Sequence, residues 1–420
     1  MNVGMRAFYA AFFALLAIAP ASGYIDPGTG SMLFSFITGI TVTLFFFCKN
    51  LIIKLRTGGF FGAVAAKKNM RHSLVIYSEG RQYWNVFSPV LEELSRRGVP
   101  CAYYSSDEGD PGLCFDSPHV KAECIGKGNA AFRFLNFLEA DLCLMTTPGL
   151  DVLQLRRSPG VGRYVHILHS TADVGLYKLF SFDYFDAMLL TGPVQIEGIR
   201  ELERKRGTPE KELIVSGCTY LDVLASRPLP PKGPEKTVLV APSWGPNSIF
   251  ARFGLDLLEP LARSSYRVII RPHPQSLISE APLVRSLQEV LASYPNVEWN
   301  FDAENIMTLS RSDLMISDFS GVIFDFAFLF GRPVFCPEFE FDVRAYEASD
   351  LDQGSWTLRA NRELSMPLEA PFANIEAVLD RAAARKDIHE TINRIRNQVC
   401  PYPGEAGSRS AGAICAMLHS

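Results

Sequence analysis

The chain has 420 residues, of which 48% are hydrophobic and 20% charged, so it is long enough for about two globular domains. A formal net charge of -4 offers no overall basic surface, which argues against nucleic acid as a partner. The nine cysteines are scattered, without a C-x-x-C pair or a Cys/His cluster at zinc spacing. We therefore expect reduced cysteines, no metal and no cofactor.

Two apolar segments open the chain. Residues 7–21 follow Arg6 and resemble a signal peptide, and residues 32–48 are just long enough to span a bilayer as a helix. Lysines and arginines gather after the second segment, which predicts that the body faces the cytoplasm whether or not the first segment is cleaved. Residues 1–58 are thus predicted to hold a signal-like segment and a transmembrane anchor in the inner or cytoplasmic membrane.

Beyond the anchor, short runs rich in Val, Ile and Leu alternate with amphipathic stretches, a pattern typical of parallel strands with crossover helices. We expect an α/β N-terminal Rossmann-like domain over residues 70–225. Its predicted strands are 73–77, 99–104, 141–145, 164–168, 186–190 and 213–216, and its predicted helices lie near 84–97, 130–139 and 194–206.

Residues 226–236 contain four prolines and are predicted to be a linker. The pattern then restarts and predicts a C-terminal Rossmann-like domain over 237–372, facing the first domain across a cleft. C-terminal helices are expected over 373–420. The predicted strands of the second half are 237–241, 267–270, 297–300, 313–316 and 333–336, and its helices are 251–264, 281–293, 303–310 and 320–330.

The first candidate site is a stiff loop, Arg271-Pro272-His273-Pro274, directly after a predicted strand. Open α/β sheets bind ligands at the carboxyl ends of their strands. Arg supplies paired donors and His can donate to a phosphate oxygen, so the loop suits a diphosphate. A turn with an exposed Arg and a packed His is the alternative.

The second candidate is Ser317-Asp318-Phe319-Ser320-Gly321, between a predicted strand and a predicted helix. Hydroxyls and free N–H groups at a helix amino terminus can bind an anion, although Asp318 or Ser320 could equally be a simple N-cap. Asp325 follows inside an apolar helix, as a paired carboxylate or a ligand-facing group.

The third candidate is His169, at the end of predicted strand 164–168. A histidine facing the cleft is suited to deprotonate an acceptor hydroxyl at neutral pH. His166, which alternates with apolar neighbours, is expected to be structural. Two weaker loops are Ser78-Glu79-Gly80-Arg81, which could cradle a substrate group or be a turn, and the acidic stretch 105–110, which could hold a metal or be a solvated turn.

These segments resemble the CDP-glycerol glycerophosphotransferases, the teichoic-acid primase and polymerase group with a GT-B-type fold. The resemblance covers roughly residues 140–350. The matching stretches, in order, are His169-Ser170-Thr171, Ala241-Pro242-Ser243-Trp244, Pro272-His273-Pro274, and Ser317-Asp318-Phe319-Ser320-Gly321 with Phe324-Asp325.

The chain departs from the family pattern at two positions: Ser170 stands in place of a glycine, and Gly321 in place of a second serine. The resemblance implies that residues 70–225 form the acceptor domain and residues 237–372 the donor (nucleotide) domain. It also implies catalytic roles for His169 and Asp318. It implies donor binding by Arg271, His273, Ser317, Ser320, Asp325 and Ser243.

The implied activity is transfer of glycerol phosphate from CDP-glycerol, or a related nucleotide-activated donor, to a hydroxyl of a lipid-linked or polymer acceptor at the membrane, with release of CMP. A GT-B glycosyltransferase using a nucleotide sugar for envelope polysaccharide synthesis is the first alternative. A catalytically inactive membrane-bound scaffold is the second.

Overall fold

The computed structural model describes residues 71–419 apart from 230, 303, 339 and 384–387. The predicted anchor within residues 1–58 lies outside the described residues. Within the described part of the chain, no helix combines the length and the apolar character needed to cross a membrane. Each of the cysteines that the structure describes is free.

The first sheet is wholly parallel and has the strand order β3-β2-β1-β4-β5-β6-β7. Its central strands are apolar on both faces because helices cover both, and β1 and β4 are almost entirely buried. The strands are β1 (His72–Ser78), β2 (Cys101–Ser105), β3 (Val120–Cys124), β4 (Ala140–Met145), β5 (Val161–Ile167), β6 (Ala187–Leu190) and β7 (Glu212–Val215).

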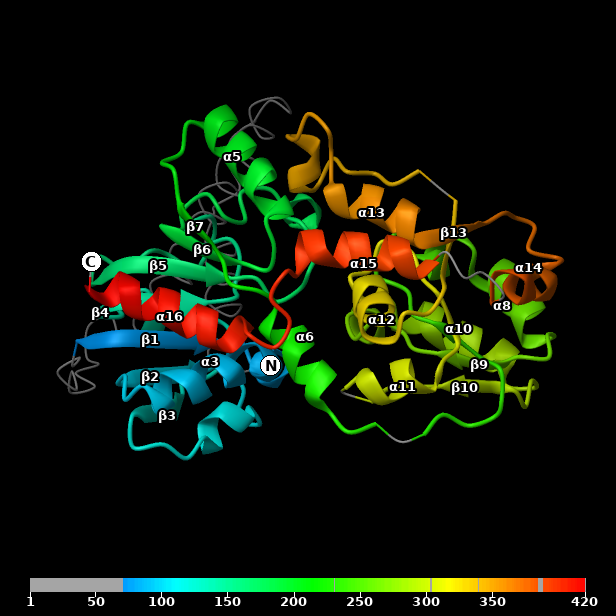
Figure 1. Cartoon of the computed structure of the whole chain (residues 1–420), viewed down its shortest axis with the longest axis horizontal. Helices are drawn as coiled ribbons and strands as arrows, with labels where there is room; N and C mark the ends of the chain where they lie inside the picture. The colour runs from blue at the N-terminus through cyan, green and yellow to red at the C-terminus, as the bar shows by residue number, and fades with distance from the viewer. Residues whose placement is uncertain (1–70, 230, 303, 339, 384–387, 420) are drawn as a thin grey trace, which may run out of the picture. The chain divides into compact units, whose positions relative to one another are not determined.

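The helices of the first half follow the strands in the expected alternation (Figure 1). Helix α3 buries an apolar stripe that includes Val86, Phe87 and Leu91 on the sheet. The helices are α3 (Trp84–Arg96), α4 (Asn129–Leu135), α5 (Val194–Arg206) and α6 (Thr219–Ser226), with short 3-10 turns η1 (Arg81–Tyr83), η2 (Pro111–Cys114) and η3 (Val174–Leu176).

The second sheet is also wholly parallel, with the order β10-β9-β8-β11-β12-β13. Its strands are β8 (Thr237–Val240), β9 (Arg267–Ile270), β10 (Val297–Trp299), β11 (Leu314–Ile316), β12 (Val334–Pro337) and β13 (Ser365–Leu368). The two parallel sheets confirm the predicted α/β class.

Helices pack on both faces of the second sheet, around two clusters of buried side chains. They are α7 (Ile249–Arg252), α8 (Gly254–Ala262), α9 (Ser276–Ser279), α10 (Ala281–Leu291), α11 (Ile306–Arg311), α12 (Val322–Phe330), α13 (Trp356–Leu364), α14 (Ile375–Ala383) and α15 (Ile388–Val399), with the 3-10 turn η4 (Glu347–Ser349). The chain ends in α16 (Ala406–His419).

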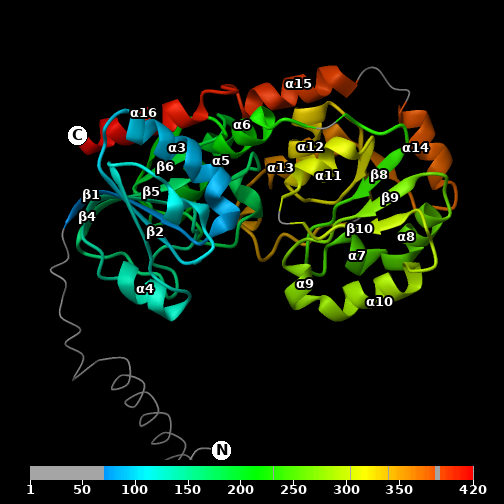
Figure 2. The same ribbon diagram turned by 90° about the horizontal axis from the view of Figure 1, so that it is seen from below.

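The last helix returns to the first half of the chain. In α16, Ala411, Ile414 and Met417 are buried in the same cluster as Phe87 of α3, and both ribbon views place α16 beside α3 (Figures 1 and 2). Asp222 of α6 fastens the segment before α16 by accepting from the N–H groups of Gly404 and Ala406. The end of the chain thus completes the core of the first sheet.

The elements that were not expected from the sequence include β3, β13, α6, α9 and α13. Strand β3 alternates exposed and buried residues at the sheet edge, and β13 contains Pro367, which an edge strand tolerates because one of its sides is unpaired. Helix α6 ends at Ser226, the first residue of the predicted linker 226–236. Its Leu221 and Leu224 are buried, and Leu221 packs with the core of the second sheet.

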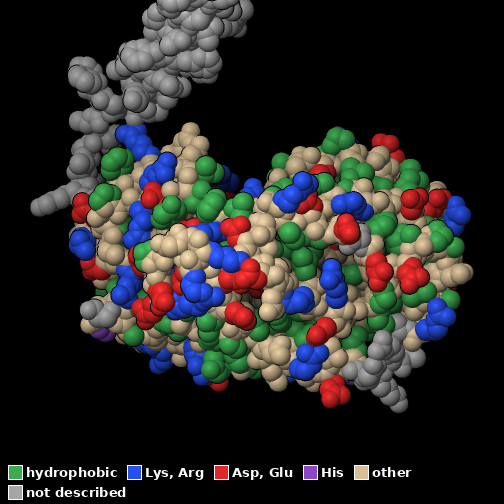
Figure 3. Space-filling view, turned by 90° about the horizontal axis from the view of Figure 1, so that it is seen from above, with side chains coloured by type: hydrophobic (Ala, Val, Ile, Leu, Met, Phe, Trp, Pro, Cys, Tyr) green, Lys and Arg blue, Asp and Glu red, His purple; other side chains and the backbone are tan. Residues whose placement is uncertain are grey.

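Acidic and basic side chains are mixed on the face seen in Figure 3, where Lys and Arg lie among Asp and Glu. Charged side chains at the surface of the described residues are often paired, as in Lys205, whose ammonium contacts Glu201 and Asp352. Such a surface fits the small net charge of the chain.

Candidate functional site

Both sheets change winding direction at one place, between β1 and β4 in the first and between β8 and β11 in the second. Ligands of open α/β sheets bind outside the carboxyl ends of the strands at such points. A cavity of about 530 Å³ lies at these strand ends. Its lining includes Arg81, Gln82 and Trp84 after β1, and Arg271, His273 and Ser320 after β9 and β11.

Another cavity, of about 470 Å³, lies at the opposite edge of the second sheet, where Lys236 and Arg267 begin or precede strands. Its charges are paired, because Arg267 contacts both Glu235 and Glu298. The amino-terminal edge of a parallel sheet is not where such folds bind ligands. We therefore place the candidate site at the carboxyl edge.

His273 presents a hydrogen-bond donor to the cavity. Its Nδ1 accepts from the backbone N–H of Gln275 at 3.1 Å, so a neutral ring carries its proton on Nε2. Burial lowers the pKa of His273, against a smaller opposing effect of Glu280, and favours that neutral form. The ring of Trp244 lies 6.4 Å away, tilted by 34°. A neutral Nε2–H donor beside an aromatic ring suits a phosphate attached to a nucleoside.

Arg271 is held from its far side. Its guanidinium donates to the side-chain oxygen of Asn300 and, at 2.8 Å, to the carbonyl oxygen of Asp302. Burial lowers the pKa of Arg271, yet a guanidinium remains protonated in proteins. The side chain therefore brings a positioned positive charge to the same cavity as His273.

Asp318 joins two loops of the second sheet. Its carboxylate accepts from four backbone N–H groups, those of Ser243, Ile249, Phe319 and Ser320, at 2.7–3.2 Å. Burial raises the pKa of Asp318, and these amides oppose the rise. The side chain is not part of the cavity wall described above. Its catalytic role stays a prediction, and its contacts are those of a positioning residue.

The two serines of this loop lie differently. Ser317 is fully buried, and its hydroxyl donates to the carbonyl oxygen of Ala241 at 2.6 Å, which ties the ends of β11 and β8 together. Ser320 is half-buried and lines the cavity. Of the two hydroxyls predicted to bind the donor, that of Ser320 is in reach of a ligand. The backbone N–H and hydroxyl of Ser243 face Asp318.

Asp325 lies behind the wall of the cavity, in α12. It is 7% exposed, and burial raises its pKa to about 7, against hydrogen bonds from Tyr220 and Asn305 that lower it. Those two side chains line the cavity. Asp325 therefore lies behind Tyr220 and Asn305, and its donor-binding role stays a prediction.

His169 follows β5, as expected, and is half-buried between two tyrosines. The ring of Tyr83 lies 5.3 Å away edge-on, and the hydroxyl of Tyr177 lies 3.4 Å from Nδ1. Burial lowers the pKa of His169 to about 4, so the imidazole is neutral at pH 7 and can accept a proton. His169 does not line the cavity. It packs against Tyr83, and the sequence neighbours of Tyr83, Gln82 and Trp84, do line the cavity.

His166 has the structural position expected for it. It is fully buried, its Nε2 lies 3.0 Å from the carbonyl oxygen of Thr146, and its ring packs on Phe182 and Phe185. Burial lowers the pKa of His166 to about 3. The ring is therefore a neutral part of the core.

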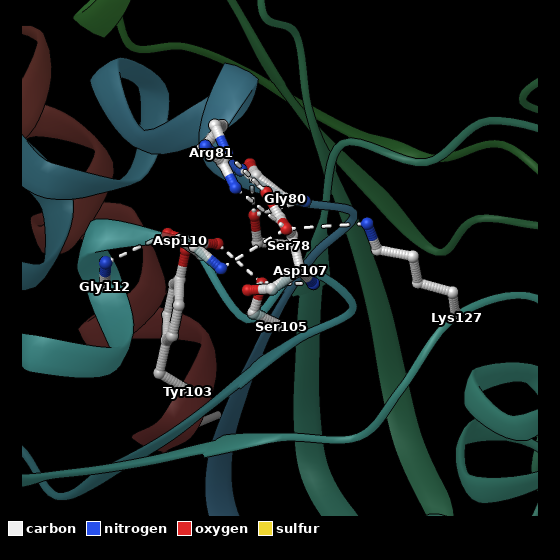
Figure 4. A network of polar contacts seen from close by, with 10 residues as sticks. Ser78, Gly80, Arg81, Tyr103, Ser105, Asp107, Asp110, Gly112 and Lys127 are labelled. Atoms are coloured by element: carbon white, nitrogen blue, oxygen red, sulfur yellow. Dashed lines mark hydrogen bonds and ion pairs between the residues drawn. The ribbon is translucent and has the colours of Figure 1, made fainter.

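The carboxylates of Asp107 and Asp110, in the acidic stretch 105–110, are bound to other groups of the protein (Figure 4). Asp110 accepts from the hydroxyls of Tyr103 and Ser105 and from the N–H of Gly112, at 2.7–2.9 Å. Asp107 pairs with Arg81. Among the residues that the structure describes, no group of His, Cys, Asp and Glu is placed to hold a metal ion.

Several lining residues were missed by sequence reasoning. Tyr220 and Asn305 lie on α6 and just before α11 and carried no recognisable signal. Arg81 did carry one, since Ser78-Glu79-Gly80-Arg81 directly follows a strand. That loop now stands at the switch point of the first sheet.

Residues 222–352 match the family model of the CDP-glycerol:poly(glycerophosphate) glycerophosphotransferases. This match confirms the resemblance expected from the motifs, and it contains the loops of Ser243, His273 and Asp318. No curated protein matches the chain.

Solved structures share the fold. The wall teichoic acid polymerase TagF is 16% identical, with a TM-score of 0.56, over 89% of this chain and 96% of that chain. A TagF variant soaked with CDPG is 17% identical, with a TM-score of 0.56, over 89% and 95%. UDP-GlcNAc 2-epimerase from Neisseria meningitidis bound to UDP-GlcNAc is 15% identical, with a TM-score of 0.51, over 83% and 100%. These likenesses show the fold, two parallel α/β halves of GT-B-like type.

Proposed function

We propose that the chain transfers glycerol phosphate from CDP-glycerol to a hydroxyl of a membrane-associated or cell-envelope polymer and releases CMP. The match of residues 222–352 to the glycerophosphotransferase family model supports this proposal. The observation that carries the proposal is the convergence of Arg271, His273 and Ser320 on one cavity at the carboxyl edge of the second sheet. A cation, a neutral N–H donor and a hydroxyl are suited to a diphosphate.

In the proposed reaction, an oxygen of the acceptor hydroxyl attacks the phosphorus that bears glycerol. A new P–O bond forms, the bond to the bridging oxygen breaks, and its electron pair leaves with CMP. His169, whose ring is neutral at pH 7, takes the hydroxyl proton as the new P–O bond forms. Arg271 and His273 stabilise the charge on the diphosphate, which is the main protein contribution in phosphoryl transfer.

Asp318 and Asp325 support this chemistry from behind in our proposal. Asp318 fixes the loop of Ser320 through backbone N–H groups, and Asp325 contacts Tyr220 and Asn305 of the wall. Neither carboxylate needs to touch the donor for these roles.

The membrane part of the proposal depends on the amino-terminal sequence. The apolar segments 7–21 and 32–48, with the positive residues that follow, support an anchor in the cytoplasmic membrane and a cytoplasmic catalytic body. Such an anchor would keep the enzyme at the surface where a lipid-linked acceptor is found. Protease protection of the body in inverted and right-side-out vesicles tests this orientation.

The activity is tested by incubating membranes that contain the full-length chain with CDP-glycerol, other CDP-alcohols and UDP-sugars, and identifying the nucleotide released. Release of CMP from CDP-glycerol supports the proposal. Release of UDP instead supports a nucleotide-sugar transferase, a second candidate favoured by the fold shared with the UDP-GlcNAc-bound epimerase.

The variant His169→Ala distinguishes an enzyme from the remaining alternative, an inactive scaffold. We expect a loss of about 100-fold or more in kcat for this variant if His169 is the base. His119→Ala, which changes a histidine outside the cavity wall, is the matched control. Donor binding without turnover by the wild-type protein would identify a scaffold.

A further inference from the structure

The loop after β1 stands at the switch point of the first sheet, the position equivalent to that of the Ala241–Trp244 loop in the second. It continues into η1, whose Arg81 and Gln82 line the cavity. Tyr83, the last residue of η1, packs against His169. One short turn therefore contacts both the cavity and the residue proposed as base.

A buried network fixes the backbone of this loop (Figure 4). The hydroxyl of Ser78 contacts the backbone of Gly80 at both its N–H and its carbonyl, at 3.0–3.1 Å. Gly80 has φ +151, and a Cβ there would lie 2.8 Å from the Cβ of Asp107. Only glycine allows the loop after β1 to approach the loop after β2 so closely.

The same network aims the guanidinium of Arg81. Asp107 accepts from Nε at 2.7 Å and from Nη2 at 3.3 Å, and this pairing raises the pKa of Arg81. Lys127 approaches the same carboxylate at 3.5 Å. Side-on pairing uses two of the five N–H donors of the guanidinium and leaves the edge formed by Nη1 and Nη2 for another anion.

The absence of a side chain at Gly109 leaves the space that the guanidinium of Arg81 occupies. A Cβ at Gly109 would lie 1.9 Å from Nη2 of Arg81 and 2.5 Å from Cζ. The backbone of Gly109 needs no left-handed conformation, so the missing side chain serves the packing of Arg81. The Arg81 side chain is nevertheless 59% exposed and open to a ligand.

We propose that Arg81 binds a phosphodiester of the acceptor, next to the hydroxyl that attacks the donor. The inference rests on the proposed function, and it assigns the contact with a phosphate of the acceptor to Arg81. Arg81 serves the acceptor because it lies on the His169 side of the cavity, whereas Arg271 and His273 come from the second sheet. Asp107 and Gly109 act as positioning residues for it.

The test uses two soluble probes, glycerophosphoglycerol, which has one phosphodiester between two glycerols, and diglycerol, which lacks the phosphate. Binding to the purified full-length protein is measured by titration calorimetry. We expect the wild type to prefer glycerophosphoglycerol by about 10-fold or more, as for a charge-assisted contact. Arg81→Gln and Gly109→Ala are expected to lose this preference.

Arg156→Gln is the matched control, because Arg156 has a similarly exposed side chain, 57%, outside the cavity wall. It should keep the preference of the wild type. Gly109→Ala displaces only the flexible end of Arg81, so circular dichroism should show a native fold. A preference retained in Arg81→Gln, or absent from the wild type, overturns the proposal.

An activity measurement separates acceptor from donor. With CDP-glycerol as donor, Arg81→Gln should raise the KM for glycerophosphoglycerol and leave the KM for CDP-glycerol unchanged. A raised KM for CDP-glycerol would assign Arg81 to the donor and refute an acceptor site. If the wild type releases no CMP, the proposed function fails, while the binding measurement still decides the role of Arg81.

Discussion

Tyr83 packs edge-on against His169, with ring centroids 5.3 Å apart and planes inclined by 66°. The contact joins the turn after β1 to the end of β5, the second neighbour of β1 in the sheet. It also helps to bury the imidazole, and burial is what lowers the pKa of His169 to about 4. The packing of Tyr83 thus contributes to the burial that keeps His169 neutral.

Removing that ring should shift the pH dependence of the reaction. In Tyr83→Ala, His169 is better hydrated, so its pKa should rise from about 4 toward the ordinary 6.5. The base must be neutral, so the acidic limb of kcat/KM for the acceptor should move to higher pH. Tyr83→Phe keeps the ring and should keep the wild-type profile. If the acidic limb is unchanged in Tyr83→Ala, the limb does not report the titration of His169.

Asp318→Asn distinguishes a positioning role from a catalytic one. The amide keeps one oxygen but presents an NH₂ group to backbone N–H donors, so the loop should be destabilised by about 1–3 kcal/mol. We expect a higher KM for CDP-glycerol and a kcat within a few-fold of wild type at saturating donor. A kcat lowered by several orders of magnitude, with the KM unchanged, would restore the catalytic role predicted for Asp318.

Ser317→Ala should change the stability of the protein, whereas Ser320→Ala should change the KM for the donor. The first removes the hydrogen bond to the carbonyl of Ala241 and should lower the free energy of unfolding by about 1–2 kcal/mol, with little change in the KM for the donor. The second removes a hydroxyl from the cavity and should raise that KM with little change in stability. Denaturant unfolding and steady-state kinetics on both variants test the pair, and equal donor effects would contradict the assignment.

Asp325 should make stability depend on pH. Its pKa is raised from 3.8 to about 7 in the folded protein, so between these values the folded state binds the proton that the unfolded state has lost. This group's contribution to the free energy of unfolding therefore falls as pH rises from about 4 to about 7. Asp325→Asn should lack this contribution, so the difference between variant and wild type should change over that interval. A constant difference would show that the carboxyl titrates normally.

The periodicity of apolar runs was enough to predict the α/β class and most strands near their observed positions, because a strand covered on both faces is apolar throughout. Edge strands and C-terminal elements were harder to predict from the sequence. Strand β3 is half exposed, β13 contains a proline, and the packing of α16 on α3 depends on contacts between residues far apart in the chain. No local pattern encodes such contacts.

The order of apolar runs and polar loops was sufficient to predict which loops follow strands and carry donors, among them those of His169, Arg271 with His273, and Ser320. The hydrogen-bond partner of each side chain could be known only from the folded chain. Ser317 and Asp318 are adjacent to Ser320, yet their polar atoms are occupied by Ala241 and by backbone N–H groups. The position of Arg81 likewise depends on Asp107 and Gly109, from another strand's loop. Hydrogen-bond partners come from the folded chain, so the residue type showed the capacity to bind and the fold determined where it is used.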